Sequence, residues 1–262
     1  MNEMENVFLK GDCLEVMKMI KDNSVSCIIA DLPYEALNKR NAFAKWDTQL
    51  PFKEMWEQFL RVTKRDAAIV LFAQGMFTAK LMMSKPSLWR YNLVWKKGER
   101  SSGFLNAKKM PLRNHEDICV FYRKQPVYHP QMRYTGKPNH TRGTTTRIVN
   151  RCYGKFGKAA DVFSNEKYPI SIIDFDRPHP PIHPTEKSVD LIRWLVRTYT
   201  NAGDLVLDPT AGSGTTCIAC IKERRRWIGI ERDEGFFALA DSRINEVRNR
   251  PDQMEFDFRG NE

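Results

Sequence analysis

The sequence predicts an α/β fold in which a mostly parallel sheet carries helices on both faces. Strand-like segments alternate along the chain with segments that repeat at helical spacing, which is the pattern of doubly wound folds. Most of the strand-like segments are continuous apolar runs, as expected when both faces of a sheet are buried. The 262 residues are enough for one such domain with a full core and a sizeable insertion.

The elements of this fold can be placed along the chain. Strands are expected at residues 25–30, 67–73, 91–95, 116–122, 204–207 and 227–230. Helices are expected at residues 13–21, 52–63, 188–199, 215–223 and 234–247. The helix at residues 188–199 is expected to pack against the sheet, because Leu191, Ile192, Leu195, Val196 and Tyr199 fall on one of its faces.

Composition predicts a soluble, cytoplasmic protein with an anionic partner. Lys and Arg total 42 against 32 Asp and Glu, and the resulting net charge of +10 favours polyanions such as nucleic acids. No apolar run approaches the ~20 residues of a membrane span. The N-terminal residues lack the basic and apolar regions of a secretory signal. We therefore expect no membrane partner.

The cysteines do not predict a metal site. The sequence contains 6 cysteines, and only Cys217 and Cys220 form a C-x-x-C pair. A zinc site would need two more ligands at comparable spacing, and the sequence has none. Both cysteines fall in a predicted helix, where small buried residues are the better interpretation.

Residues 123–168 interrupt the alternation of strands and helices, because they show no clear period. Their cations, against the two acids Asp161 and Glu166, carry +8 of the net +10. Such a long irregular segment inside a compact domain is either functional or disordered. A solvated basic loop without specificity is the alternative to a nucleic-acid contact. The cations are Arg123, Lys124, Arg133, Lys137, Arg142, Arg147, Arg151, Lys155, Lys158 and Lys167.

A glycine turn follows the predicted strand at residues 204–207. The turn leads from this strand into a helix and consists of Asp208-Pro209-Thr210-Ala211-Gly212-Ser213-Gly214-Thr215. Glycines allow a ligand to approach the backbone closely, and the helix N-terminus offers free N–H groups. Glu231 ends the next strand 19 residues after Gly212, where an acid can accept hydrogen bonds from ribose hydroxyls. A purely structural strand-to-helix turn is the alternative.

The string Asp31-Leu32-Pro33-Tyr34 follows the carboxyl end of the predicted strand at residues 25–30, where open α/β sheets bind ligands. The string resembles the D-P-P-Y motif of amino-DNA methyltransferases, and this resemblance implies methyl transfer to an exocyclic amine, whose lone pair is delocalised into a ring. The Asp31 carboxylate and a loop carbonyl can hold the two amino hydrogens, and Tyr34 can stack on a base swung out of a duplex. Direct in-line displacement would then depend on positioning and electrostatics. A simple turn is the alternative.

These strings together resemble the motifs of the β class of amino-DNA methyltransferases. The glycine turn resembles the family's S-adenosylmethionine motif, and Asp31-Leu32-Pro33-Tyr34 resembles its D-P-P-Y motif, with Leu32 in place of a proline. His183-Pro184-Thr185-Glu186-Lys187 resembles its H-P-T-x-K string, and Gly11-Asp12-Cys13 also matches. Asp31 precedes Gly212 by 181 residues, which is the motif order of the β class. The resemblance implies a permuted, Rossmann-like methyltransferase fold.

The resemblance also implies a cofactor, S-adenosylmethionine, and the residues around it. In the family, the acid at Asp12 reaches the adenine of the cofactor, and residues 183–187 line its methionine side. Without the resemblance, Asp12 is as well explained as the N-cap of the helix that follows it. Spacing alone makes Thr185 only a loop residue that can cap the next helix. The implied cofactor-binding residues are Asp12, Cys13, Asp31, His183, Thr185, Lys187, Asp208, Pro209, Thr210, Gly212, Ser213, Gly214, Thr215, Glu231 and Arg232.

The activity implied by the resemblance is site-specific methylation of the N6 amine of adenine in duplex DNA, with base flipping and direct transfer. The implied catalytic residues are Asp31, Leu32, Pro33 and Tyr34. Leucine at position 32 provides the same backbone carbonyl as the proline of the family, and only the fixed φ of proline is lost. Asp at position 31 favours adenine, because N4-cytosine enzymes usually carry serine there. No cysteine follows a proline, which excludes C5-cytosine methylation through a Pro-Cys nucleophile.

Three alternatives to this activity stay open. The first is an N4-cytosine DNA methyltransferase, and the second is an RNA or protein amino-methyltransferase. The third is a DNA-binding module with a dead site, against which the intact Gly212, Gly214 and Glu231 argue.

The resemblance places target recognition between the two motifs. It implies a catalytic half (residues 1–122), a basic target-recognition insertion (123–181), a cofactor-binding half (182–250) and a flexible tail (251–262). Duplex DNA is the expected partner, and the family suggests a homodimer and a cognate restriction endonuclease. Residues 104–109 and 113–116 are candidates for contacts with the DNA backbone or a base. The expected DNA-binding residues are Lys39, Arg40, Arg133, Lys137, Asn139, Arg142, Arg147 and Arg151.

Overall fold

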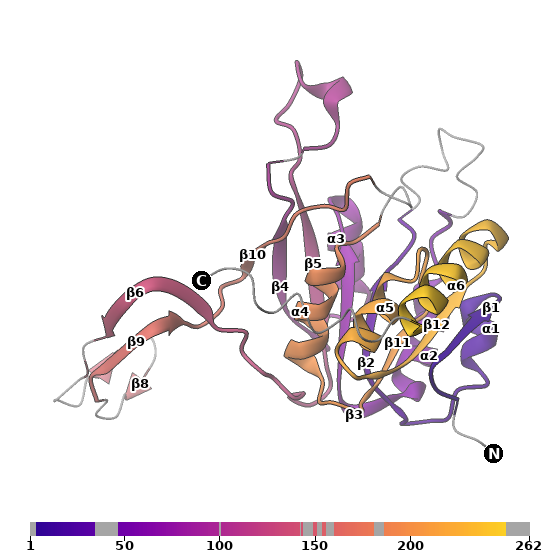
Figure 1. Ribbon diagram of the computed structural model, residues 1–262, viewed down its shortest axis with the longest axis horizontal. Coiled ribbons are helices and arrows are strands. Elements are labelled where there is room, and N and C mark those ends of the chain that lie inside the picture. Colours follow the sequence, from indigo (N-terminus) through magenta and orange to yellow (C-terminus); the bar gives the residue numbers. More distant parts are fainter. Residues whose placement is uncertain are drawn as a thin grey trace. The chain divides into compact units, whose positions relative to one another are not determined.

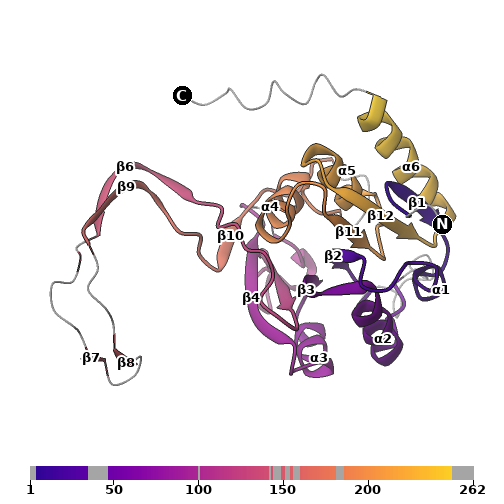
Figure 2. The same cartoon turned by 90° about the horizontal axis from the view of Figure 1, so that it is seen from below.

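The chain forms two compact units, one of residues 1–129 and 171–262 and the other of residues 130–170 (Figures 1 and 2). The computed structural model describes residues 4–34, 47–99, 101–141, 143, 149–150, 154–155, 160–180 and 186–249. Within these ranges, no helix has both the length and the apolar character that a membrane span requires.

Among the described residues, an eight-stranded sheet forms the centre of the first unit. Its order is β1 (Val7–Lys10), β12 (Arg226–Glu231), β11 (Leu205–Asp208), β2 (Val25–Asp31), β3 (Thr63–Ala73), β5 (His115–Phe121), β4 (Trp89–Lys96) and β10 (Ile172–Asp174). Neighbouring strands are parallel except that β5 runs antiparallel to both β3 and β4. The expected α/β fold with a mostly parallel sheet is therefore confirmed.

All of the expected strands are present, and the sheet has two edge strands that the sequence did not reveal. The residues of β1 are only partly buried, and in β10 only Ile173 is buried. Their apolar runs are also short, with three residues in β1 and two in β10.

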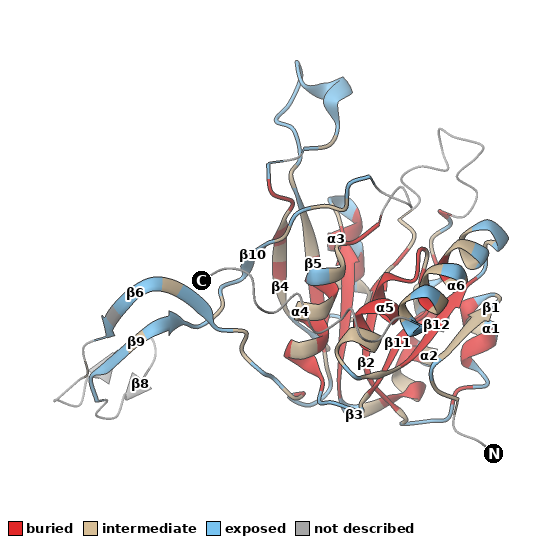
Figure 3. Ribbon diagram, viewed as in Figure 1, coloured by how far each residue is buried: buried red, intermediate tan, exposed pale blue. Residues whose placement is uncertain are grey.

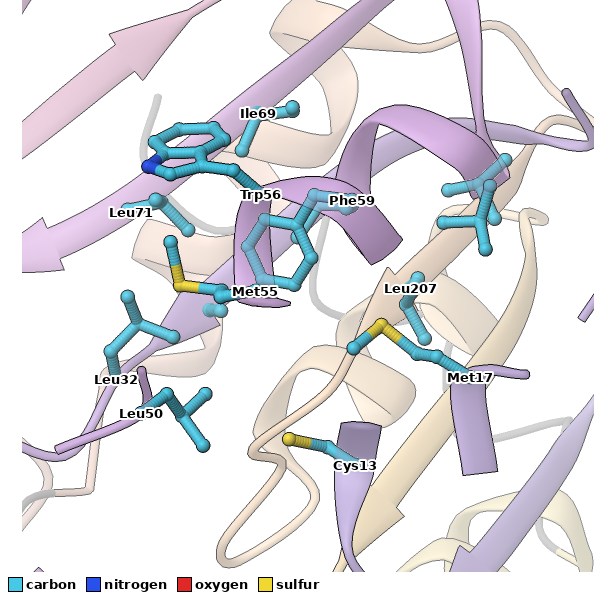
Figure 4. Close-up of a cluster of buried hydrophobic side chains, with 14 of the residues drawn as sticks. Cys13, Met17, Leu32, Leu50, Met55, Trp56, Phe59, Ile69, Leu71 and Leu207 are labelled. Atoms are coloured by element: carbon cyan, nitrogen blue, oxygen red, sulfur yellow. The ribbon is translucent and has the colours of Figure 1, made fainter. Parts of the chain in front are cut away.

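Helices cover both faces of the sheet, whose central strands are buried (Figure 3). On one face lie α1 (Cys13–Met17), α2 (Phe52–Val62) and α3 (Met76–Ser84); on the other lie α4 (Val189–Tyr199), α5 (Thr215–Lys222) and α6 (Glu234–Asn249). Successive strand residues enter opposite clusters, since Ile28 belongs to the first and Ile29 to the second. Figure 4 shows the first cluster, in which Trp56 and Phe59 of α2 pack on β3.

Two helices differ from the sequence prediction. The helix α1 ends at Met17 instead of residue 21. The helix α3 was not predicted, because apolar side chains occur on its exposed as well as its buried side. Met76 and Met83 are 74% and 73% exposed, whereas Phe77 and Leu81 are buried. The two cysteines of the C-x-x-C pair are buried in α5, among the second cluster.

The second unit is built on an antiparallel hairpin of β6 (Arg133–Thr141) and β9 (Val162–Lys167), and β7 (Val149–Asn150) pairs with β8 (Gly154–Lys155). The expectation that residues 123–168 are irregular is therefore wrong for these strands. Most of the described side chains of β6 and β9 are exposed. Without a buried face, a strand lacks the apolar alternation by which it is recognised in a sequence.

Candidate active site

The carboxyl ends of β2, β11 and β12 border a cavity of about 440 Å³. This is the edge at which open α/β sheets bind their ligands. The structure brings together at this cavity residues predicted for the catalytic loop and for the cofactor, which come from both ends of the sequence. They are Asp12, Cys13, Asp31, Leu32, Pro33, Tyr34, Lys187, Asp208, Pro209, Thr210, Gly212, Ser213, Thr215, Glu231 and Arg232.

Gly214 belongs to the predicted cofactor set but does not line this cavity. It has a φ of 76° and lies just before α5. A Cβ at this position would lie 3.2 Å from the Cβ of Ala240 and 3.1 Å from the Cδ1 of Ile244, both in α6. The glycine therefore allows α5 and α6 to pack closely.

Two residues of the predicted cofactor set, His183 and Thr185, lie outside the described residues. The helix α4 begins after Ser188, which is its N-cap. The interpretation of Thr185 as the cap of this helix is therefore wrong, because a cap is the residue directly before the first helical one.

Glu231, at the end of β12, holds the glycine turn. The Gly212 N–H donates to its Oε2 at 2.9 Å, and the Asp233 N–H donates to its Oε1 at 2.8 Å. Burial raises the pKa of Glu231, although these backbone hydrogen bonds lower it. An ionised carboxylate has about four acceptor sites. The Arg232 backbone also hydrogen-bonds this carboxylate, so about one acceptor site remains for a hydroxyl group of a ligand.

Asp12 is fixed by the helix that it begins. Its Oδ1 accepts a hydrogen bond from the Leu14 N–H at 2.9 Å, so it is the N-cap of α1. Asp12 also lines the cavity. The two interpretations of Asp12 are therefore compatible, because the side chain that caps α1 also lies at the cavity.

The carboxylate of Asp31, at the end of β2, is held from two sides. The Tyr34 hydroxyl donates to its Oδ1, and the Lys187 ammonium donates to its Oδ2 at 2.5 Å. The Thr210 hydroxyl donates to the Asp31 backbone carbonyl at 3.0 Å. This last bond ties the loop of residues 31–34 directly to the glycine turn.

The rest of the loop of residues 31–34 is also held by contacts with its surroundings. The Tyr34 N–H donates to Asp47 Oδ1 at 2.8 Å. The Tyr34 ring contacts the Phe77 ring of α3, with 4.7 Å between the ring centroids. The Leu32 side chain is buried in the core beneath the loop. Leucine at this position therefore packs in the core, whereas a proline would make the loop backbone more rigid.

A buried series of alternating charges continues from Asp31. Lys187 Nζ lies 3.3 Å from Glu116 Oε2, and Lys97 Nζ donates to Glu116 Oε1. Side-chain exposure is 7% for Lys187, 7% for Lys97, 12% for Glu116 and 20% for Asp31. All four residues line the cavity.

The charges of this series set one another's pKa values. Burial raises the pKa of Asp31, although Lys187 opposes the increase. Burial also opposes the charge of Lys187, but Asp31 and Glu116 together raise the pKa of Lys187. Lys187 and Lys97 outweigh burial at Glu116 and lower its pKa. The site therefore keeps ionised groups beside a cavity with aromatic walls, which include Phe72 and Trp95.

Lys97 and Glu116 were not among the residues predicted for catalysis or for the cofactor, although residues 113–116 were candidates for contacts with DNA. Each lies near the end of a predicted strand, since Lys97 comes two residues after residues 91–95 and Glu116 begins residues 116–122. The antiparallel register of β4 and β5 pairs Trp95 with Glu116, so the end of one strand lies beside the start of the other. The sequence shows a charged residue at each position. Only the antiparallel pairing of β4 with β5, which the sequence does not reveal, brings the two charges together.

The predicted DNA-binding residues divide into two groups. Arg133, Lys137 and Asn139 lie in β6 of the second unit. Lys39, Arg40, Arg142, Arg147 and Arg151 lie outside the described residues.

Comparison with known proteins identifies the family. A family model described as DNA methylase, of the N6 and N4 type, matches residues 25–242. The chain belongs to this family. The resemblance to amino-DNA methyltransferases is thereby confirmed, and this DNA methylase is an enzyme that acts on DNA.

Relatives of this DNA methylase match it over nearly its whole length. It is 24% identical to the type II methyltransferase M.HinfI of Haemophilus influenzae, over 97% of this chain and 72% of that one. It is 23% identical to the type II methyltransferase M.HpaI of Haemophilus parainfluenzae, over 96% of this chain and 78% of that one.

Solved structures show that the DNA methylase shares its fold with other methyltransferases. The complex of M1.HpyAVI with SAM has a TM-score of 0.63 at 22% identity, over 91% of this chain and 98% of that one. The PvuII DNA methyltransferase, which is cytosine-N4-specific, has a TM-score of 0.63 at 15% identity, over 93% of this chain and 91% of that one.

Proposed function

We propose that this DNA methylase transfers a methyl group from S-adenosylmethionine to the N6 amine of adenine within a short sequence of duplex DNA. The observation that carries the proposal is the Asp31 carboxylate, which lies in the cavity and is tied through its own backbone to Thr210 of the glycine turn. The acceptor for the amine and the residues for the methyl donor are therefore parts of one site. By resemblance, aspartate at position 31 favours adenine.

The cavity offers the groups that S-adenosylmethionine requires, and the sulfonium of this cofactor supplies the electrophilic methyl group. Glu231 keeps an acceptor site for the ribose hydroxyls, and Gly212 allows close approach to the backbone. Asp12 lines the cavity on the side that the family uses for the adenine of the cofactor, and Lys187 belongs to the string that the family uses for its methionine side.

The catalytic loop activates the target amine by hydrogen bonding. The Asp31 carboxylate accepts one amino hydrogen with a lone pair that Tyr34 and Lys187 leave free, and a loop carbonyl at Leu32 accepts the other. These bonds would draw the nitrogen lone pair out of conjugation and direct it at the methyl group that bound S-adenosylmethionine would supply. One amino hydrogen would then leave the methylated nitrogen as a proton. The Tyr34 ring, supported by Phe77, stacks on the flipped base.

The basic second unit recognises the target sequence in this proposal. Arg133 and Lys137 carry positive charge on an exposed strand, where they neutralise phosphates. Asn139 is of a type that reads adenine edges in the major groove. A homodimer and a cognate restriction endonuclease stay predictions from the family resemblance.

Single-molecule sequencing of DNA from cells that express the protein tests the proposal, because it reports the modified base and its sequence context together. We expect N6-methyladenine at one short motif, and none with Asp31→Ala, which should still bind S-adenosylmethionine. The cytosine-N4 specificity of the PvuII enzyme makes N4-cytosine methylation the second candidate. Mass analysis of the nucleosides decides between the two. Methylation of RNA alone, or full activity of Asp31→Ala, would contradict the proposal.

A further inference from the structure

The connection between β4 and β5 forms an ordered projection, here called the finger (residues 101–114). At its base, the Ser102 N–H donates to the Arg113 carbonyl at 2.7 Å, and the Arg113 N–H donates back to the Ser102 carbonyl at 3.2 Å. At its tip is a 3₁₀ turn, η1 (Phe104–Asn106), where the Asn106 N–H donates to the Gly103 carbonyl at 2.8 Å. The finger extends beyond the ends of both strands (Figure 1).

The tip of the finger exposes large apolar side chains. Phe104 is 78% exposed, Leu105 is 82% exposed and Met110 is 58% exposed. Figure 3 shows most of the projection as exposed, and within residues 101–114 Ser102 and Asn114, at the base, are partly buried. Adjacent exposed apolar side chains on an internally hydrogen-bonded backbone are typical of a surface that a partner covers.

The charge and the position of the finger indicate which partner this is. Residues 101–114 contain Lys108, Lys109 and Arg113 and no acid, which suits a polyanion. Ser102, at the base of the finger, lines the same cavity as Asp31 and Tyr34. A duplex that delivers a base to this cavity therefore comes close to the tip of the finger.

We propose that the finger inserts Phe104 and Leu105 into the DNA duplex at the position that the flipped target base vacates, while Lys108 and Lys109 contact the flanking phosphates. Apolar side chains act as such wedges because they replace the stacking that a displaced base loses. The proposal rests on the base-flipping methylation proposed above. It adds the surface that holds the duplex open during transfer.

The exposure of the tip allows a test without loss of the fold. The double variant Phe104→Ala/Leu105→Ala removes side chains that contribute little to the core. Its matched control is Met19→Ala/Met83→Ala, which removes side chains that are 62% and 73% exposed. Met19 precedes β2 and Met83 lies in the last turn of α3, so both lie toward the edge of the sheet opposite Asp31.

The measurement is the fluorescence of 2-aminopurine at the target position of a duplex that contains the methylation motif, together with the single-turnover methylation rate of the unmodified duplex. With saturating wild-type or control protein, we expect the fluorescence increase of an unstacked base. With the finger variant, we expect loss of most of this increase and a methylation rate about 10-fold lower, as for loss of base stacking. Binding of S-adenosylmethionine should be unchanged.

Each contrary result has a distinct meaning. Full fluorescence and full rate in the finger variant would overturn the wedge. Concentration-dependent self-association of the wild type that only the finger variant loses, with unchanged methylation, would overturn it in favour of a protein-binding surface. If the wild type methylates DNA without a fluorescence increase, base flipping and the wedge fail but methylation stands. If it methylates no DNA, the proposed function fails as well.

Discussion

At the scale of residues, the site depends on the pairing of buried charges. Asp31, Lys187, Glu116 and Lys97 alternate in sign, and each contacts the next. Removing one member of a buried pair leaves an uncompensated charge, which costs more than the pair contributes. The position of the Asp31 carboxylate is therefore linked to Glu116, although no bond joins the two residues directly.

Glu116→Gln tests this link through the pH dependence of methylation. Asp31 must be ionised to accept the amino hydrogen, so activity falls as the pH decreases through its pKa. The negative charge of Glu116 raises the pKa of Asp31, so its removal lowers that pKa. We expect the acid limb of the single-turnover rate to move to lower pH. We also expect the plateau rate to fall roughly 10- to 100-fold, because Lys187 is less well positioned.

The matched control for this variant is Glu15→Gln. Glu15 forms an ion pair with Lys18 on the surface, where side-chain exposure is 69% and 58%. Such pairs contribute little, so the pH profile should match that of the wild type. A profile of Glu116→Gln that is scaled down without a shift of its acid limb would indicate a structural role alone.

At the scale of elements, the hairpin unit is an addition to a sheet that is complete without it. Its strands β6 and β9 pair with each other, whereas β10, which follows, pairs with β4 in the main sheet. The residues that line the cavity all belong to the first unit. Cofactor binding and target recognition should therefore be separable.

Replacing residues 130–170 with a flexible Gly/Ser linker tests this separation. We expect S-adenosylmethionine to bind within a few-fold of its wild-type affinity in calorimetry, and thermal unfolding to stay cooperative. Site-specific methylation should be lost, as read by sequencing of cellular DNA. Methylation at the original motif by the shortened chain would show that recognition lies elsewhere.

How far the sequence predicted these elements depended on burial. The central strands and the helices α2, α4, α5 and α6 were recognisable, because their apolar residues follow the period of the element. The strands β1, β6, β9 and β10 were not, because most of their side chains are only partly buried or are exposed. At the site, Asp31 and Gly212 belong to recognisable strings. Lys97 and Glu116 became part of the site only through the antiparallel pairing of β4 and β5.

At the scale of the whole molecule, the two ends of the chain build one sheet and one cavity. The strands β12 and β11, from the C-terminal part, lie between β1 and β2 from the N-terminal part. The cavity takes Asp12 and Asp31 from one part and Gly212 and Glu231 from the other. A ligand in this cavity therefore stabilises the assembly of both parts.

Thermal unfolding with and without S-adenosylmethionine measures this effect. A ligand that binds only the folded state adds about 2.7 kcal/mol at 100 times its dissociation constant. For a domain of this size, that corresponds to an increase in Tm of roughly 5–10 °C. We expect Glu231→Gln, at the same cofactor concentration, to show a smaller increase, because it weakens an acceptor for the ribose. An equal increase in both proteins would exclude Glu231 from the cofactor site.

Because β12 and β11 lie between β1 and β2, the chain can be produced as two fragments that must assemble to form the sheet. Two polypeptides cut within residues 130–170 would each carry strands whose sheet neighbours are in the other. Neither fragment could close the sheet or complete the cavity alone, whereas co-expression would restore both. Such a pair would act as a split enzyme, in which methylation reports that two separately produced fragments have met.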